Sequence, residues 1–292
     1  MKNIKGNLIL LFAALIWGSA FVAQSAAMDF VEPFTYNTLR SYIAFVFLLP
    51  ITFILRNKNI TSEERKTINH NSIIGGICCG IVLTFAMSFQ QIGISYTTAG
   101  KAGFITALYI IFVPIVGILF KKKTPKQIWL CVLIALVGFY LLCIKENFSI
   151  GKGDFLVLCC AICFSFQIIA IDYFNLKNID GIMMSCIQFL VVGILSTIPM
   201  LLFETPNATN IMNAKVTILY AGILSSGVAY TLQIIGQKYT DPTVATLLMS
   251  LESVFAALSG WLILHEVLST KELIGCALVF LAVILAQMPN KK

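Results

Sequence analysis

Long apolar runs separated by short polar interruptions dominate this sequence. Each run has about 20 residues, the length at which an α-helix crosses the hydrocarbon core of a bilayer. Strands of a membrane barrel are about ten residues long and alternate in polarity, which these runs do not. The pattern predicts an all-α polytopic membrane protein with ten transmembrane helices, at residues 7–27, 33–55, 72–95, 98–120, 127–144, 153–172, 181–203, 215–236, 242–264 and 272–288.

A short polar pattern recurs in the two halves of the chain. Gln-x-x-Gly-x-x-Tyr-Thr begins at Gln90 and again, 143 residues later, at Gln233, each time near the end of the third run of its half. Five runs separate the two copies, so the copies end on opposite sides of a membrane. The pattern predicts two inverted five-helix repeats, residues 1–148 and 149–292, an architecture typical of alternating-access carriers.

Composition and charge support a membrane protein. Hydrophobic residues make up 59% of the 292 positions and charged residues only 11%, too much apolar surface for a soluble core to hide. Most lysines and arginines outside the runs, such as Lys121 to Lys123, fall on the side of the N-terminus, which predicts that both termini are cytoplasmic. The net charge of +7 therefore indicates contact with anionic lipid headgroups of the bilayer and no nucleic-acid partner.

Reactive residues do not form the spacings that an enzyme or a metal site needs. Most of the nine cysteines lie inside apolar runs, and the CxxC of Cys160 and Cys163 has no histidine nearby. No glycine-rich phosphate loop and no nucleophile with a neighbouring base can be found. We expect no catalytic residue, no metal and no cofactor, and any transport to be driven by gradients.

Three charged residues fall inside the predicted spans, where a charge is costly and usually faces a cavity or a partner. Arg40 lies in the second span, Lys101 near the start of the fourth, and Glu252 close to the middle of the ninth. Arg40 and Lys101 could line an electropositive outer half of a cavity for a carboxylate or phosphate. Alternatively, Lys101 snorkels to the interface, Arg40 donates to helix-end carbonyls, or Glu252 forms a structural ion pair with one of them.

Aromatic and amide side chains share helix faces with these charges. The 143-residue shift places Glu252 opposite Tyr109, which lies on the same face of its helix as Lys101, eight residues earlier. Trp17 in the first span and Tyr230 in the eighth are accompanied on their faces by glutamines. Each aromatic could instead be a packing residue, but together they favour a polar, aromatic-lined interior.

Several short motifs occur in an order that is similar to the EamA family of the drug/metabolite transporter superfamily. They are Ala-Leu-Ile-Trp-Gly-Ser-Ala-Phe at 14–21, the arginine at position 40, Tyr-Thr-Thr-Ala-Gly-Lys-Ala-Gly-Phe at 96–104 and Leu-His-Glu at 264–266. The resemblance implies an inner-membrane carrier with a central cavity, often an exporter of amino acids, other metabolites or drugs. It also implies that Glu266 is a helix-end or hinge residue and not a ligand.

The sequence thus predicts a secondary transporter that exports a small organic solute, such as an amino acid or related zwitterion. Arg40 and Lys101 would neutralise an anionic group, Trp17, Tyr109 and Tyr230 would contact the organic body, and Glu252 would bind a proton or an amine. A proton is the candidate coupling ion and a homodimer a candidate assembly. A channel or a non-transporting membrane scaffold are the alternatives, and mutation of Glu252 and Arg40 would leave a scaffold unaffected.

Overall fold

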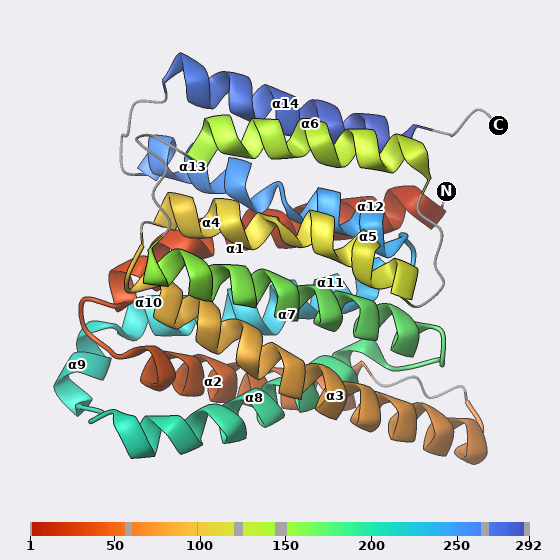
Figure 1. The fold of residues 1–292 in the computed structure, drawn as a ribbon. Helices are drawn as coiled ribbons and strands as arrows, with labels where there is room; N and C mark the ends of the chain where they lie inside the picture. The colour runs from red at the N-terminus through yellow and green to blue at the C-terminus, as the bar shows by residue number, and fades with distance from the viewer. Residues whose placement is uncertain are drawn as a thin grey trace.

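The computed structural model describes residues 2–55, 60–97, 99–119, 125–143, 151–263 and 269–288, and no β-strand occurs in these ranges. Figure 1 shows a bundle of parallel and antiparallel helices in which α1 begins and α14 ends at the same end. The first half contains α1 (Lys2–Ala27), α2 (Pro33–Ile54), α3 (Ser62–Ile94), α4 (Ala99–Ala107), α5 (Tyr109–Leu119) and α6 (Lys126–Cys143).

The second half has the same order of long segments, with more interruptions. A six-residue helix, α9, lies between two spans and was not predicted, and a π-helix, η1, interrupts the eighth predicted span. The elements are α7 (Lys152–Asn175), α8 (Gly181–Phe203), α9 (Ala208–Asn213), α10 (Lys215–Tyr220), η1 (Ala221–Ala229), α11 (Tyr230–Gln237), α12 (Pro242–Met249), α13 (Glu252–Ile263) and α14 (Thr270–Gln287).

Eight helical segments in the described ranges are long and apolar enough to cross a membrane. The helix at Lys126–Leu141 is apolar but shorter. Large hydrophobic side chains such as Val46, Phe53 and Phe203 are exposed on the outside of the bundle, as expected where lipid and not water surrounds a protein. The prediction of an all-α polytopic membrane protein is therefore confirmed, whereas the number of ten spans stays a prediction.

Helix α3 begins ten residues before the predicted third span. Thr61 Oγ1 accepts a hydrogen bond from the backbone N–H of Glu64 at 3.2 Å, and Glu64 Oε2 accepts one from the backbone N–H of Thr61 at 3.0 Å. This reciprocal capping box satisfies N–H groups that the first turn of a helix leaves without partners. The added turns are polar, so the apolar pattern alone could not reveal them.

Two helices are interrupted at positions related by the repeat. Leu108 separates α4 from α5, and Ser250 with Leu251 separates α12 from α13. The shift of 143 residues carries Leu108 onto Leu251, so α5 and α13 begin at equivalent positions, Tyr109 and Glu252. Both breaks lie inside predicted spans. They place the start of a half-helix within the bundle, and the N–H groups of Ile111 and Phe255 donate to the carbonyl oxygens of Leu108 and Leu251 at the breaks.

The start of α7 packs closely against the end of α3. A Cβ atom at Gly153 would lie 2.8 Å from the carbonyl oxygen of Gly93 and 2.9 Å from Cβ of Tyr96, so this approach requires glycine. Thr97 Oγ1 donates a hydrogen bond to Asp154 Oδ1 at 2.8 Å. We call these contacts the α7–α3 interlock. It joins the second half of the chain to the first.

The same contacts recur between the start of α1 and the segment that follows α11. A Cβ atom at Gly6 would lie 2.8 Å from Cβ of Tyr239 and 3.0 Å from the carbonyl oxygen of Gly236. Thr240 Oγ1 donates to Asn7 Oδ1 at 3.4 Å. These contacts form the α1–α11 interlock, at the opposite end of the bundle from the α7–α3 interlock (Figure 1).

A lysine over a tyrosine ring completes each interlock. Lys152 Nζ lies 5.0 Å from the centroid of the Tyr96 ring, and Lys5 Nζ lies 5.3 Å from the centroid of the Tyr239 ring. The tyrosines are related by the shift of 143 residues and the lysines by a shift of 147. The recurring Gln-x-x-Gly-x-x-Tyr-Thr pattern is thus explained in part by packing, since its Gly, Tyr and Thr hold the first helix of the other half.

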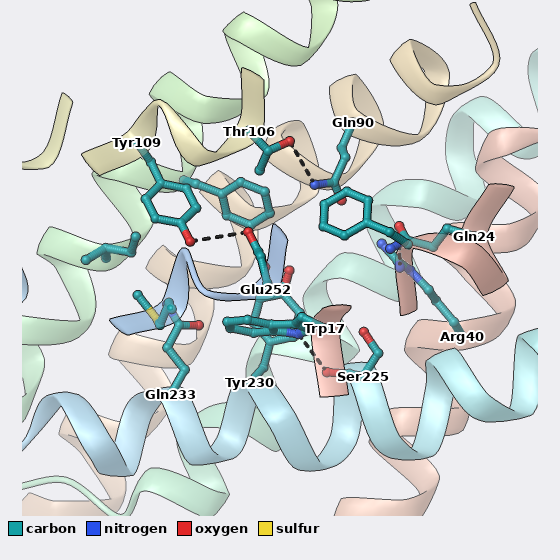
Figure 2. Close-up of a pocket in the computed structure, with 14 residues that line it drawn as sticks. Trp17, Gln24, Arg40, Gln90, Thr106, Tyr109, Ser225, Tyr230, Gln233 and Glu252 are labelled. Carbon is teal, nitrogen blue, oxygen red and sulfur yellow. Dashed lines mark hydrogen bonds between the residues drawn. The ribbon is translucent and has the colours of Figure 1, made fainter. Parts of the chain in front are cut away.

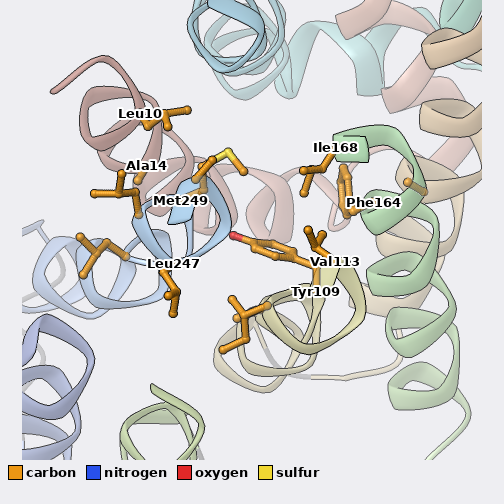
Figure 3. Packing of buried hydrophobic residues seen from close by; sticks show 14 of the residues in the cluster. Leu10, Ala14, Tyr109, Val113, Phe164, Ile168, Leu247 and Met249 are labelled. Atoms are coloured by element: carbon orange, nitrogen blue, oxygen red, sulfur yellow. The ribbon is translucent and has the colours of Figure 1, made fainter. Parts of the chain in front are cut away.

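The buried apolar core lies between the two halves of the chain. In Figure 3, Val113 of the first half packs near Phe164 and Ile168 of the second. Leu10 and Leu247 belong to the same cluster and are fully buried. This shared core keeps the two halves together around the site described next.

Candidate solute-binding site

A cavity lies inside the bundle and is lined by side chains from both halves (Figure 2). The lining side chains come from α1, α2, α3, α4, α5, α7, η1, α11, α12 and α13. The free space in this central cavity is about 40 Å³, and one water molecule needs about 10–15 Å³ by the same measure. The central cavity can therefore hold a few water molecules, and a larger solute requires it to expand.

The central cavity brings together five of the six residues proposed from the sequence. They are Trp17, Arg40, Tyr109, Tyr230 and Glu252. The backbone of Lys101 belongs to α4, but its side chain lies outside the described residues, as does the Leu-His-Glu motif at 264–266. That the five line one cavity is a finding, whereas their role as solute contacts stays a prediction.

Glu252 begins α13 and is almost completely buried, with 5% of its surface exposed. The hydroxyl of Tyr109 donates a hydrogen bond to Glu252 Oε1 at 3.2 Å. N–H groups of the first turn of α13 donate to backbone oxygens of the preceding residues, Ser253 to Ser250 and Phe255 to Leu251. Among the described side chains, no cation forms an ion pair with Glu252. The hypothesis of a structural ion pair with Arg40 is therefore not supported.

Arg40 is also buried, with 2% of its surface exposed. Its Nη1 donates to Gln24 Oε1 at 3.2 Å, and its Cζ lies 5.3 Å from the centroid of the Tyr36 ring. Its Nε has no hydrogen-bond partner. In the part of the chain that the structure describes, no carboxylate pairs with Arg40. An arginine held only by an amide and an aromatic ring is suited to receive an anionic group from a ligand.

Aromatic rings form one wall of the central cavity. The rings of Trp17 and Tyr230 meet edge to face, with centroids 4.8 Å apart, and Phe189 packs behind Tyr230 at 5.3 Å. Trp17 Nε1 donates to the backbone oxygen of Ser225 at 3.3 Å. Ser225 lies in the π-helix η1, a rare element that often occurs at functional sites. The polar edge of Trp17 is thus satisfied while its apolar surface remains available to a ligand.

Many residues that line the central cavity are related in pairs by the internal repeat. The 143-residue shift relates Gln90 to Gln233 and Thr106 to Met249, and the 147-residue shift seen in the interlocks relates Trp17 to Phe164 and Phe21 to Ile168. The central cavity therefore surrounds the axis that relates the two halves.

Arg40 and Gln24 break this symmetry, because no lining residue corresponds to either of them. In Figure 2 they lie at one end of the central cavity, and Tyr109 with Gln233 lies at the other. Among the described residues that line the central cavity, the positive charge thus lies at the end formed by Arg40 and Gln24.

Several lining residues were not proposed from the sequence, including Gln90, Thr106 and Ser225. Gln90 and Gln233 begin the two copies of the repeat pattern, and that position was a usable signal. Nothing in the apolar pattern distinguishes Thr106 or Ser225 from other small residues in a span. Within the described ranges, no group of three or more His, Cys, Asp and Glu residues is placed to hold a metal ion.

A helical bundle with an apolar exterior and an internal cavity lined by aromatic, amide and charged side chains defines a class of membrane protein that binds a solute between its helices. Within this class, the model of the EamA-like transporter family matches the chain twice, over residues 4–144 and 151–288. The chain belongs to the EamA-like transporter family. The resemblance inferred from the motifs is confirmed, and the two matches give the two-repeat layout.

Similar proteins agree with this assignment. A protein of Archaeoglobus fulgidus described as an uncharacterized transporter is 33% identical over 289 residues, covering 99% of this chain and 87% of its own length. The uncharacterized transporter YoaV of Bacillus subtilis is 24% identical, covering 94% of each chain. A crystal structure with 19% sequence identity superposes with a TM-score of 0.77 over 97% of this chain and 96% of its own, which shows the shared fold. The protein is a multi-pass membrane transporter, consistent with the inner membrane.

Proposed function

We propose that this transporter exports a small zwitterionic organic solute, such as an amino acid, through the central cavity by alternating access. Arg40 binds the anionic group of the solute, Glu252 binds its ammonium group, and Trp17, Tyr109 and Tyr230 contact the organic body. Lys101 is proposed to add positive charge from the outer side. The direction of transport follows from the family resemblance alone.

One observation carries this proposal: the central cavity contains a buried cation and a buried acid that do not pair with each other. Arg40 keeps an Nε without a partner, and among the described side chains Glu252 is held by the hydroxyl of Tyr109. An ionised group buried without a counter-ion is costly, by several kcal/mol. A solute that carries both charges would satisfy Arg40 and Glu252 together, which a purely cationic or purely anionic solute would not.

The architecture supports a mechanism in which the two halves, residues 1–148 and 149–292, exchange roles. We propose ten spans with both termini in the cytoplasm, so that the α1–α11 interlock lies on the cytoplasmic side and the α7–α3 interlock on the outer side. Because the free space is only about 40 Å³, loading a solute requires the central cavity to expand. The helix breaks at Leu108 and at Ser250 and Leu251 are natural points for such movement.

Glu252 is also the candidate site for a coupling proton. A carboxyl group at this depth is favoured when it either binds a proton or pairs with a cationic group of the solute. Exchange of a solute ammonium for a proton at Glu252 would couple export to inward proton movement without a second site.

Counterflow in proteoliposomes tests the proposal. Purified protein would be reconstituted with an unlabelled solute inside, and uptake of the labelled solute would be followed for amino acids, other small metabolites and cationic dyes. We expect saturable exchange of at least one amino acid, reduced at least tenfold in Glu252→Gln and in Arg40→Gln. Exchange that both variants retain in full would contradict the proposed site and leave the carrier mechanism in place.

The same assay separates the alternatives. A channel would give flux that does not saturate and no counterflow, because counterflow requires a carrier that returns loaded. Exchange of cationic dyes with no exchange of amino acids would replace the zwitterion with a cation as the substrate class. Flux of no solute in the panel would contradict the proposal and favour a scaffold role.

A further inference from the structure

Three buried glutamine side chains form a hydrogen-bonded chain that starts at the wall of the central cavity. Gln233 on α11 lines the cavity, and its Nε2 donates to Oε1 of Gln167 on α7 at 3.2 Å. Gln167 Nε2 in turn donates to Oε1 of Gln188 on α8 at 3.4 Å. Gln167 and Gln188 are fully buried, and Gln233 is 2% exposed. These hydrogen bonds connect the wall of the central cavity on α11 to α7 and α8.

The direction of the hydrogen bond from Gln233 to Gln167 determines which polar atom of Gln233 remains available. Because its Nε2 is used by Gln167, its Oε1 is left as the other hydrogen-bonding group, and this oxygen is buried without a partner. A buried carbonyl oxygen without a hydrogen bond costs about 1–3 kcal/mol. The cavity that Gln233 lines is where a donor from a solute could satisfy it.

The repeat-related glutamine behaves differently. Gln90 Nε2 donates to Thr106 Oγ1 at 3.4 Å, across the first-half wall of the cavity. The position that corresponds to Thr106 in the second half is Met249, which has no hydroxyl group. Gln233 therefore has no local partner of that kind, and its amide is oriented by Gln167 instead. Both glutamines therefore donate from Nε2, but Gln90 bonds to a hydroxyl group on the wall of the cavity and Gln233 to an amide oxygen behind it.

We infer that Gln233 is a specificity-determining residue whose Oε1 accepts an N–H of the solute ammonium, and that Gln167 is a positioning residue that keeps this oxygen available. The inference rests on the proposed zwitterion transport and assigns the recognition of N–H groups to a second residue besides Glu252. Figure 2 shows Gln233 at the end of the cavity opposite Arg40, as a solute with separated charges requires.

The chemical consequence is discrimination by the number of N–H groups on the solute. A primary ammonium can donate to Glu252 and to Gln233 at the same time. An N-trimethylated ammonium carries the same charge but has no N–H, so it attracts Glu252 and leaves Gln233 Oε1 without a partner. The transporter should therefore prefer primary amino acids over their N-trimethyl derivatives by about tenfold or more, given the usual strength of a hydrogen bond from a charged donor.

Competition in the counterflow assay measures this preference. The probes are glycine, L-leucine and L-phenylalanine, each tested as the labelled solute with its primary and its N-trimethylated form as competitors. The readout is the inhibitory concentration of the N-trimethylated competitor divided by that of the primary amino acid, measured for the solute that exchanges fastest. The variants are Gln233→Met and Gln167→Met, which keep side-chain length and remove the amide, and Gln167→Glu, which keeps an oxygen that can accept from Gln233 Nε2.

Gln237→Met is the matched control. Gln237 lies one turn after Gln233 on α11, is equally buried, and donates from Nε2 to the backbone oxygen of Ile168 at 3.2 Å, but it does not line the central cavity. Any loss of preference for the primary amino acid that is caused only by removing a buried amide from α11 would appear in Gln237→Met as well. Unchanged elution as a single species in detergent would show that each variant is folded.

We expect the ratio to fall about tenfold in Gln233→Met and in Gln167→Met, and to stay at the wild-type value in Gln167→Glu and in Gln237→Met. A wild-type ratio in Gln233→Met, with amino-acid exchange intact, would overturn this inference and leave the proposed function in place. If Gln233→Met does not fold, a wild-type ratio in Gln167→Met would overturn the inference equally. Absence of exchange of all three amino acids by the wild type would overturn the proposed function, and this inference with it.

Discussion

Tyr109 and Glu252 share a hydrogen bond of 3.2 Å and lie 143 residues apart, the same shift that relates the two copies of the repeat pattern. Two equivalent positions of a repeat can touch each other only close to the axis that relates the repeats. Each residue is also the first of a half-helix, α5 or α13. The pair therefore marks the axis of the molecule, with a phenol on one side of it and a carboxyl group on the other.

The first prediction concerns the charge on Glu252. If Glu252 binds a solute ammonium, protonation removes the negative charge, so the rate of amino-acid exchange should fall as the pH is lowered. Glu252→Gln carries no titrating group at this position, and we expect its residual exchange to be at least tenfold slower and nearly independent of pH between about 5 and 8. Counterflow at a series of equal internal and external pH values measures both effects.

Tyr109→Phe is the companion variant, because it removes only the hydroxyl that donates to Glu252. A hydrogen bond to a charged group contributes about 1.5–3 kcal/mol, so the exchange rate should change about tenfold to a hundredfold while its pH dependence remains. Loss of the pH dependence in this variant would mean that the tyrosine, and not the carboxyl group, is the group whose protonation matters.

Arg40 gives the second prediction, which concerns the anionic end of the solute. Arg40→Gln should weaken binding of an amino acid about tenfold to a hundredfold, because a charge-assisted hydrogen bond is lost. Binding of the amino-acid methyl ester, which has no carboxylate, should change little in the same variant. Isothermal titration in detergent would compare the two ligands, with the exposed Lys215→Gln as the control for a lost positive charge.

The third prediction tests the α7–α3 interlock. In Gly153→Ala the new Cβ would press on backbone atoms of Gly93 and Tyr96 at 2.8–2.9 Å, which should lower the free energy of unfolding by about 1–3 kcal/mol. Gly103→Ala is the matched control, since its Cβ would meet only Ser253 Oγ at 3.8 Å. Thermal unfolding in detergent should show a lower midpoint for Gly153→Ala alone. Equal midpoints would mean that α7 and α3 separate readily.

The fourth prediction tests the orientation of the chain in the membrane. Ser62, at the start of α3, and Ala208, at the start of α9, are exposed at opposite ends of the bundle (Figure 1). In a variant without native cysteines, Ala208→Cys should react with a membrane-impermeant maleimide added to intact cells. Ser62→Cys should react only after the membrane is permeabilised. The reverse pattern would place the termini outside the cytoplasm.

Helix positions could be predicted from the sequence because membrane helices are selected by length and apolar content. The second predicted span, 33–55, differs by one residue from α2, and the seventh, 181–203, coincides with α8. The extension of α3 and the breaks in the fourth and ninth spans could not be predicted in this way. A capping box is a polar feature, and a break within an apolar run depends on how neighbouring helices pack.

The charged residues of the site could be predicted from the sequence because charges are rare inside membrane spans. Arg40 and Glu252 are unusual inside spans, and the structure places both in the central cavity. The glutamines and the π-helix are less conspicuous, because amides are tolerated in helices and a π-helix has no clear sequence signature. The orientation of Gln233 depends on contacts with Gln167, which lies 66 residues away, and only a folded structure reveals it.

The two interlocks also have a consequence for how the protein is made. The α1–α11 interlock joins Gly6 to Gly236 and Tyr239, so α1 contacts a segment that is synthesised about 230 residues later. A ribosome adds roughly 5–20 residues per second, and α1 therefore spends on the order of ten seconds or longer in the bilayer before this surface exists. Insertion and packing are thus separate stages for this chain, and a ribosome that stalls before residue 236 would leave α1 inserted with its glycine surface facing lipid or the insertion machinery.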